Sequence, residues 1–315
     1  MNKERYDAVV VGGGAAGLSA GITLARAKRR VVVLDAGNPR NAPAEGVHGL
    51  LGREGIAPAE LLRAGRAELA GYGGELRRTT VTSVRRDGED LEVFTLEVSS
   101  LRARRVLMAT GLLDVLPDIP GLEERWGREV IHCPYCHGWE VRDQPIGVIA
   151  TMPLSMHQAQ LFRQWTDDLL YFARDVPLSA GDRERLDAIG VRIVDGEIDA
   201  VESGTHSRVV VRMRDGREYA RHALAVGSRM EARAEAFVGI GVGLTPHPGG
   251  SFVTADATGR TGVPGVWVAG NAGDLSAQVG AAAADGVRAA AQINADLIMT
   301  DADAAVARRR TASVA

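Results

Sequence analysis

The amino-terminal part of the chain alternates apolar runs with glycine and polar residues, in an order that predicts a strand, a turn, a helix and a second strand. The apolar run Ala8 to Val11 predicts a buried strand, and a run of glycines follows it directly. The second apolar run, Val31 to Leu34, ends in Asp35. Short apolar runs bounded by glycine are typical of strands, and a helix between them indicates a parallel βαβ unit.

The rest of the chain repeats this alternation. A helix is expected near Pro58 to Gly71, followed by strands with alternating polarity between Glu75 and Arg105. A second series of strands and helices runs from about residue 145 to 225 and begins with the apolar stretch Ile146 to Ala150. After residue 228 the pattern predicts a strand, a polar turn and a long helix of small residues. The pattern as a whole predicts an α/β fold with parallel sheets.

Composition narrows the class of protein. A length of 315 residues favours two domains, and 45% hydrophobic with 24% charged residues is ordinary for a globular protein. The net charge of −3 provides no basic field for nucleic acid. No apolar run is long enough to span a membrane, and the charged start passes into a strand pattern without the apolar core of a signal peptide. We therefore expect a cytoplasmic protein that binds neither nucleic acid nor membrane.

The first turn carries a spacing with a physical reason. Gly12, Gly14 and Gly17 form G-x-G-x-x-G between the first strand and the helix. In such a loop the first glycine permits the tight turn, the second lets a pyrophosphate approach the backbone N–H groups, and the third lets helix and strand pack closely. Asp35, eighteen residues past Gly17, suits a hydrogen bond to an unphosphorylated adenosine ribose, as in FAD or NAD.

The segment HCPYCHGWE, residues 132 to 140, contains the only two cysteines, Cys133 and Cys136. Three interpretations of these cysteines are open: a redox pair, half of a metal site, or two ordinary thiols. A zinc site would need His132 and His137, and four ligands within six consecutive residues do not readily surround one ion, so no metal is expected. A helix beginning at the first cysteine places both sulfur atoms on one face and lowers a thiol pKa. His137 is a candidate general base or only a capping residue.

Three segments then stand in a recognisable order: VVGGGAAGLSA, ATG before a C-x-x-C, and GVPGVWVAGN with AQVGAAAADG. Together they resemble the low-molecular-weight thioredoxin reductases among the FAD-dependent pyridine nucleotide-disulfide oxidoreductases, over the chain to about residue 298. The resemblance implies a two-domain, Rossmann-like fold and usually a homodimer. The expected segments are an FAD domain at 1–115 and 228–300, an inserted C-x-x-C domain at 116–227 and a flexible tail at 301–315.

The resemblance also implies which residues hold FAD. Besides the three fingerprint glycines and Asp35, the expected contacts are Ala15, Ala16, Asn41, His48, Thr110, Gly111, Asn271, Gln278 and Val279. Asn271 stands where the family has an aspartate, so its contact with the ribityl or phosphate region is expected in a changed form. His48 is either a flavin contact or an ordinary loop residue. Tyr135 and Trp139 either line a substrate pocket or belong to a core.

Two departures from the family pattern bear on function. The loop Ala150 to Ser155 lacks the glycines of the second nucleotide site, and Phe172-Ala173-Arg174 replaces the basic run that pairs with the 2'-phosphate of NADPH. We therefore expect NADPH binding to be weak or absent. The residue after the second cysteine is His137 rather than an acid. The sequence segment CPYCHGWEVRD is similar to that of the dithiol oxidase branch of this family, the gliotoxin- and holomycin-type oxidases.

That branch implies an FAD-dependent enzyme that closes an intramolecular disulfide in a small sulfur-containing natural product. In it Cys133 receives the substrate thiolate, Cys136 faces the flavin, and the electrons pass to molecular oxygen and give hydrogen peroxide. Two alternatives stay open. One is a disulfide reductase that takes electrons from a donor such as ferredoxin, which the missing NADPH motifs fit equally well. The other is a non-enzymatic, FAD-bearing redox sensor.

Overall fold

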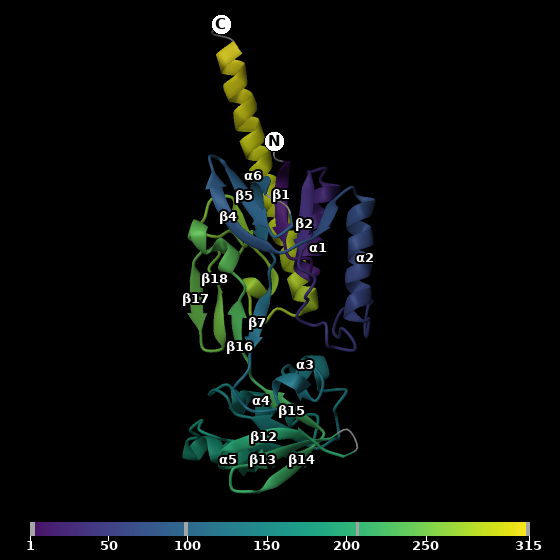
Figure 1. The fold of residues 1–315 in the computed structure, drawn as a ribbon, viewed down its shortest axis with the longest axis vertical. Coiled ribbons are helices and arrows are strands. Elements are labelled where there is room, and N and C mark those ends of the chain that lie inside the picture. The colour runs from purple at the N-terminus through teal and green to yellow at the C-terminus, as the bar shows by residue number, and fades with distance from the viewer. Residues whose placement is uncertain (1–3, 98–99, 206–207, 313–315) are drawn as a thin grey trace. The chain divides into compact units, whose positions relative to one another are not determined.

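The computed structural model describes residues 4–97, 100–205 and 208–312. The chain divides into two units, whose segments can be followed by residue number along the colour scale of Figure 1. Unit 1 comprises Met1–Ala42, Pro58–Leu113 and Glu231–Ala315, and unit 2 comprises Pro43–Ala57 and Asp114–Met230. The sequence predicts that residues 43–57 stay with the first FAD segment, whereas their contacts group them with unit 2. Pro43 is one anchor, because it packs so tightly on Gly127 that a Cβ there would lie 2.6 Å from the proline ring.

Unit 1 is built on a mainly parallel sheet in the order β3-β2-β1-β6. Strand β6 pairs with β19 through its last residues and with the antiparallel hairpin β4-β5 through its first. The register places Val9 of β1 between Val32 and Val106, all three fully buried. The bounds are β1 Arg5–Val11, β2 Val31–Asp35, β3 Glu75–Arg78, β4 Val81–Asp87, β5 Asp90–Thr95, β6 Leu101–Met108 and β19 Val266–Val268.

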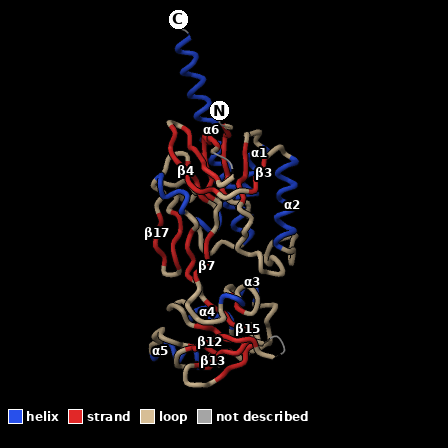
Figure 2. The backbone as a smooth tube through the Cα atoms, in the orientation of Figure 1, coloured by secondary structure: helices blue, strands red, loops and turns tan. Residues whose placement is uncertain are grey.

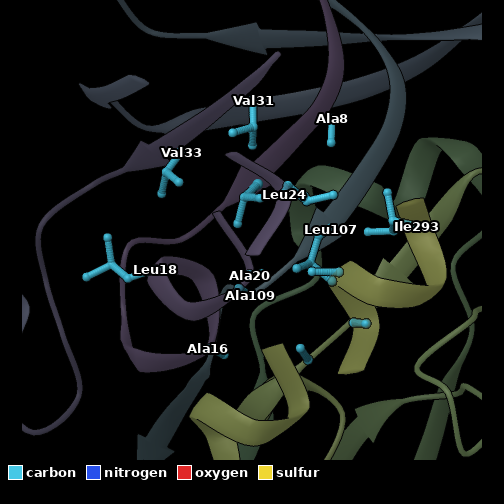
Figure 3. Packing of buried hydrophobic residues seen from close by; sticks show 14 of the residues in the cluster. Ala8, Ala16, Leu18, Ala20, Leu24, Val31, Val33, Leu107, Ala109 and Ile293 are labelled. Carbon is cyan, nitrogen blue, oxygen red and sulfur yellow. The ribbon is translucent and has the colours of Figure 1, made fainter. Parts of the chain in front are cut away.

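Helices α1 (Ala15–Arg26), α2 (Pro58–Gly71) and α6 (Val279–Ala312) pack with this sheet. Small residues let α6 approach α1 closely, since a Cβ on Gly286 would lie 2.0 Å from the Ala16 carbonyl oxygen. Figure 3 shows the resulting core, in which side chains of α1, β1, β2 and β6 belong to one cluster with Ile293 of α6. The tight spacing of two helices on one sheet is what the glycine and alanine pattern predicts.

The carboxyl-terminal end differs from the expected tail. Helix α6 continues to Ala312 instead of ending near residue 300, and its residues 301–312 are all exposed (Figure 1). Ion pairs from Arg29 and Arg104 to Asp301 hold the start of this extension against the rest of unit 1. The last three residues of the predicted tail, 313–315, lie outside the described residues.

A smaller sheet, in the order β17-β18-β16-β7, completes unit 1 at the point where the chain crosses between the units (Figure 2). Its strands are β7 Leu112–Val115, β16 Arg229–Ala232, β17 Leu244–His247 and β18 Gly250–Val253, and the short helices η2 Glu235–Ile240 and η3 Gly270–Ala272 flank them. The two crossings, at 113/114 and 230/231, lie within two or three residues of the predicted boundaries.

Unit 2 contains a second parallel sheet, in the order β11-β10-β9-β15-β8, and an antiparallel meander, β12-β13-β14. Its sheet strands are β8 Val130–Ile131, β9 Ile146–Ile149, β10 Leu169–Phe172, β11 Arg192–Val194 and β15 Ala223–Val226; the meander strands are β12 Ile198–Ser203, β13 Val209–Met213 and β14 Glu218–Arg221. Its helices are η1 Glu123–Arg125, α3 Pro134–His137, α4 Ser155–Phe162 and α5 Ala180–Ala188.

Two cores fill unit 2, one on each face of the parallel sheet. One joins Leu170 and Phe172 of β10 to Val211 of the meander. The other buries Tyr171 of the same strand with Phe162 of α4. Because both faces are covered, β9 and β10 are buried at every position and mostly apolar, as strands of buried parallel sheets usually are. The predicted α/β class, with two parallel sheets and the second unit inserted in the first, is confirmed.

Candidate functional site

The loop between β1 and α1 has two glycines that the backbone itself requires. Gly12 has φ +109°, and a Cβ there would lie 2.1 Å from the Ala109 carbonyl oxygen of the neighbouring strand end. A Cβ on Gly17 would lie 1.8 Å from the Gly12 carbonyl oxygen. These positions therefore hold the turn and the contact of helix with strand, as the spacing predicts.

Gly14 differs from its neighbours, because a Cβ added there meets no atom within 4 Å. It is the N-cap of α1, and no side chain caps the helix and no acidic residue lies in its first turn. Close by, at the end of β6, the Thr110 hydroxyl oxygen is buried without a hydrogen-bond partner among the described residues. An open glycine, uncapped N–H groups and an unpaired hydroxyl fit the pyrophosphate of a dinucleotide.

Asp35 ends β2 beside this loop and is 7% exposed. Its carboxylate accepts hydrogen bonds from the Gly37 N–H at 2.9 Å and from the Arg66 guanidinium at 3.2 Å. A Cβ on Gly13 would lie 2.5 Å from the Asp35 carboxyl carbon. The sequence reasoning missed both Gly13 and Arg66, although Gly13 was visible as the middle residue of three consecutive glycines. Together they hold the carboxylate at the edge where a ribose hydroxyl would reach it.

The other expected cofactor contacts also lie in unit 1, with one exception. Ala15 and Ala16 begin α1, Gly111 follows Thr110, and Gln278 and Val279 lie at the start of α6. Asn41 lies in a turn, half-buried. Asn271 donates its amide hydrogens to the carbonyl oxygens of Asp274 and Ala277, at 3.0 and 2.9 Å. The exception is His48, which the structure groups with unit 2 and the cysteines.

The two cysteines flank a single helical turn in unit 2. Cys133 is the N-cap of α3 in an extended conformation, and Pro134 is the first residue of the helix, where no N–H donor is needed. The Cys133 carbonyl accepts from the N–H groups of Cys136 and His137, both at 3.2 Å. The two sulfur atoms lie 2.6 Å apart as thiols. A small movement therefore closes a disulfide.

His137 follows the second cysteine and is half-buried, with its Nδ1 buried and without a partner among the described residues. Burial lowers its pKa, the carboxylate of Glu140 and the Cys133 carbonyl oppose this shift, and the nearby imidazoles of His48 and His132 add to it. The imidazole is therefore mostly neutral near pH 7 and can accept a proton from a thiol.

His132, in contrast, is bound to the backbone. Its Nδ1 lies 3.1 Å from the Val226 carbonyl oxygen, and its own carbonyl accepts from the Gln158 side chain at 2.6 Å. Within the ranges that the structure describes, no cluster of three or more His, Cys, Asp or Glu is arranged to hold a metal ion. The same residues include no helix long and apolar enough to cross a membrane.

Two aromatic side chains beside the cysteines are exposed rather than part of a core. Tyr135 is 63% and Trp139 65% exposed. The Tyr135 ring meets Trp165 edge to face at 6.1 Å, and the Arg142 guanidinium lies over the Trp139 ring at 4.1 Å. Of the two readings that the sequence left open, the core is excluded for both residues.

The loop between β9 and α4 occupies, in unit 2, the place that the glycine loop has in unit 1. Here the buried Ser155 hydroxyl accepts hydrogen bonds from the N–H groups of Thr151 and Met152, at 3.0 and 3.3 Å. The Thr151 hydroxyl donates to the Gly227 carbonyl at 2.7 Å, and Arg174 donates to the Ala150 carbonyl at 3.2 Å. The groups that would bind a phosphate are thus engaged within the protein.

Comparison with known proteins gives a consistent result. A family model described as pyridine nucleotide-disulphide oxidoreductase matches residues 6–286. The thioredoxin reductase tcpT of Claviceps purpurea is 30% identical, with 85% of this chain and 87% of that protein covered. Among solved structures, HlmI is 42% identical with a TM-score of 0.92, covering 98% of this chain and 97% of HlmI. An oxidoreductase from Agrobacterium tumefaciens is 31% identical with a TM-score of 0.89, covering 94% and 99%.

Proposed function

Because the chain belongs to the pyridine nucleotide-disulphide oxidoreductase family, we propose that it is an FAD-dependent dithiol oxidase. It closes an intramolecular disulfide in a small sulfur-containing natural product, with molecular oxygen as the final acceptor. The observation that carries this proposal is the contrast between the two nucleotide loops. The loop at Gly14 is open, whereas Ser155 fills the loop at α4. This contrast supports FAD binding in unit 1 and weak or absent NADPH binding in unit 2, and we infer that the electrons enter from a dithiol.

The cysteine pair carries the thiol chemistry. A substrate thiolate attacks the Cys133 sulfur of the oxidised pair, the enzyme disulfide breaks, and Cys136 leaves as a thiolate. The second substrate thiol then attacks the substrate sulfur of the mixed disulfide, and Cys133 leaves. The substrate has lost two electrons and two protons, and the enzyme holds Cys133 and Cys136 as a dithiol. His137 accepts the proton of the attacking thiol, because its imidazole is neutral near pH 7.

The fingerprint residues of unit 1 would hold the cofactor. The N–H groups at the start of α1 and the space beside Gly14 would receive the pyrophosphate, and Asp35 would accept from the adenosine ribose. The Thr110 hydroxyl, which has no partner among the described residues, would gain one. When bound, FAD supplies a two-electron acceptor that molecular oxygen can reoxidise, with release of hydrogen peroxide.

Two further features support the oxidase. The residue after the second cysteine is His137, whose lowered pKa leaves the imidazole neutral and able to accept a proton near pH 7. The neighbouring Tyr135 and Trp139 are exposed, and a small apolar substrate could pack on their rings. We expect the enzyme to act as a homodimer.

The test is spectroscopic and anaerobic. The flavin absorbance of the purified protein is recorded after addition of a small dithiol in one cuvette and NADPH in another, and air is then admitted. We expect bleaching by the dithiol alone, followed by recovery and one equivalent of hydrogen peroxide on aeration. Bleaching by NADPH would show a conventional reductase. Bleaching by reduced ferredoxin but by no dithiol would show the alternative donor, and the absence of bleaching by any of the three would favour a sensor.

A further inference from the structure

Helix α6 of unit 1 is apolar on two opposite faces, and the fold of the unit covers only one of them. The covered face packs with α1 and the sheet, and its buried residues are Ala282, Gly286, Ala289, Ala290, Ile293 and Leu297. A helix with one face in the core of a soluble protein usually carries polar and charged residues on the opposite face. In α6 the opposite face is apolar as well.

This uncovered face is a stripe whose residues recur at spacings of three and four. Its large members Val287, Ile298 and Val306 are 46%, 52% and 48% exposed, and Met299 at its edge is 63% exposed. Exposed alanines fill the positions between them: Ala284, Ala291, Ala295, Ala302 and Ala305. At roughly 100° per residue, these side chains lie opposite the buried face over about six helical turns. We call this set of residues the α6 stripe.

The α6 stripe continues into the part of the helix that extends past strands β1 and β4 (Figure 1). Ion pairs of Asp301 with Arg29 and Arg104 hold the helix at the start of this extension, and residues 302–312 are all exposed. Helices in proteins gain most of their stability from packing of an apolar face. A partner on the α6 stripe would give the extension the packing that unit 1 does not provide.

The charged residues beside the stripe indicate what this partner is. Asp285, Arg288, Asp303 and Arg310 lie along one edge of the stripe, in the order acid, base, acid, base. If a second copy of α6 packs antiparallel, Arg288 faces Asp303 of the second copy, and Asp285 faces Arg310. The Arg288 side chain is 56% exposed and pairs with Asp285 of its own helix, so it can take a second carboxylate. A parallel pair would place like charges opposite each other.

The apolar residues select the same antiparallel register. In it the stripe residues of the two copies face each other in three kinds of pair: Val287 with Ala305, Ala291 with Ala302, and Ala295 with Ile298. The charge pairs fall in this register to within one helical turn. Alanine opposite alanine or a larger residue lets two helix axes approach closely, with side chains of one helix between those of the other.

We propose that the α6 stripe is the surface through which two copies of this chain associate, with their α6 helices antiparallel about a two-fold axis. Each copy then uses the same surface, as a closed dimer requires. The proposal adds to the expected homodimer a helix, a direction and a register. It concerns unit 1 alone and does not depend on which substrate or electron donor the cysteine pair uses.

The test is sedimentation equilibrium of the full-length, flavin-containing protein, with one alanine substitution in the stripe and one outside it. Ala305→Glu places a carboxylate against Val287 of the second copy, whereas Ala304→Glu places it on the side away from the stripe. Both positions are exposed, and an arginine follows each by four residues, so the effect on the helix itself is matched. We expect dimers for the wild type and Ala304→Glu, and a dissociation constant about a hundredfold higher for Ala305→Glu.

The direction of the pair is tested by exchanging charges. Asp303→Arg should weaken the dimer, because two arginines then face each other, and the double variant Arg288→Asp/Asp303→Arg should restore it. Asp303→Arg and the double variant also decide the question if Ala305→Glu does not fold, since Asp303 is exposed. A double variant that remains dissociated overturns the antiparallel pair.

The remaining outcomes decide the surface itself. A wild type that is monomeric at micromolar concentrations overturns the proposal, as does an Ala305→Glu protein that dimerises like the wild type. Equal weakening by Ala304→Glu and Ala305→Glu would show a general effect of charge on the helix and would also overturn it. Dithiol oxidation is measured separately, so a protein that dimerises through α6 but oxidises no dithiol leaves this inference standing and overturns only the oxidase.

Discussion

Both units contain a strand of a parallel sheet that leads through a short loop into a helix. The two loops differ in whether their backbone N–H groups are already hydrogen-bonded to a side chain of the protein. In unit 1 the loop between β1 and α1 leaves Gly14 open and the helix start uncapped. In unit 2 the Ser155 hydroxyl accepts from the N–H groups of Thr151 and Met152, which lie in the loop before α4. The difference teaches that the βα frame does not itself bind a nucleotide; the capacity depends on whether side chains of the protein already use the loop donors.

The most severe test of this contrast is a methyl group at Gly14. Gly14→Ala should fold normally, because its φ of −79° suits alanine and its Cβ meets no atom within 4 Å. The methyl group would, however, occupy the space assigned to the pyrophosphate, so flavin content after purification should fall about tenfold or more. The measurement is the ratio of flavin to protein absorbance, with thermal unfolding of the apoprotein as the second readout.

Gly17→Ala is the matched control, since it places the same methyl group 1.8 Å from the Gly12 carbonyl oxygen. It should destabilise the apoprotein itself, by on the order of 3 kcal/mol. If Gly14→Ala retains full flavin, or loses stability as Gly17→Ala does, the open loop is not the cofactor site.

The loop between β9 and α4 in unit 2 can be tested by removing the Ser155 hydroxyl that accepts hydrogen bonds from it. Ser155→Ala should leave the Thr151 and Met152 N–H groups without an acceptor, at a cost of about 1–3 kcal/mol in the free energy of unfolding. NADPH should still fail to bleach the flavin, because the basic clamp is absent as well. Urea unfolding and anaerobic titration with NADPH give the two readouts.

Ser179→Ala provides the reference for Ser155→Ala. Ser179 caps α5 through an exposed capping box with Asp182, and its loss should cost about 1 kcal/mol or less. A Ser155→Ala protein as stable as the wild type would mean that the Ser155 hydroxyl does not stabilise the loop before α4. Reduction of its flavin by NADPH would mean that Ser155 alone closes a functional nucleotide site.

The sequence predicted those features that depend on residues close together in the chain. The strand at Ala8 to Val11, the glycine spacing and the helix Pro58–Gly71 follow from local period and turn chemistry, and the structure has them at those positions. The pairing of two cysteines with a histidine is also local. The missing glycines before α4 predicted a weakened nucleotide site, whereas its closure by Ser155 required the hydrogen bonds of the folded loop.

The features that the sequence did not predict depend on contacts between distant segments. Nothing near residues 43–57 indicates that they pack on unit 2, because the signal is the contact of Pro43 with Gly127 and of His48 with Glu140. The same holds for Gly13, whose lack of a side chain matters only because Asp35 lies against it. The extension of α6 to Ala312 was missed for another reason: its residues are all exposed, and alanines among charged residues give it only a weak apolar period.

The smallest expected effect is the pH dependence of stability that His137 of unit 2 contributes. Burial holds the pKa of His137 below its ordinary 6.5. The unfolded chain therefore binds more protons at this position than the folded protein does between the two pKa values. Stability from this residue is present above pH 6.5 and is lost as the pH falls through the folded pKa. In His137→Gln the thermal midpoint should fall less steeply below pH 6.5 than in the wild type.

The rate of dithiol oxidation should show the same titration, because protonated His137 cannot accept a proton. For the wild type we expect the acid limb of the kcat/KM profile to lie below pH 6.5, and for His137→Gln a lower rate without that limb. His157→Gln, at an exposed position, should leave both the thermal and the kinetic profiles unchanged. If His137→Gln keeps the acid limb, another group serves as the base, and the buried imidazole only shapes the turn that follows the cysteines.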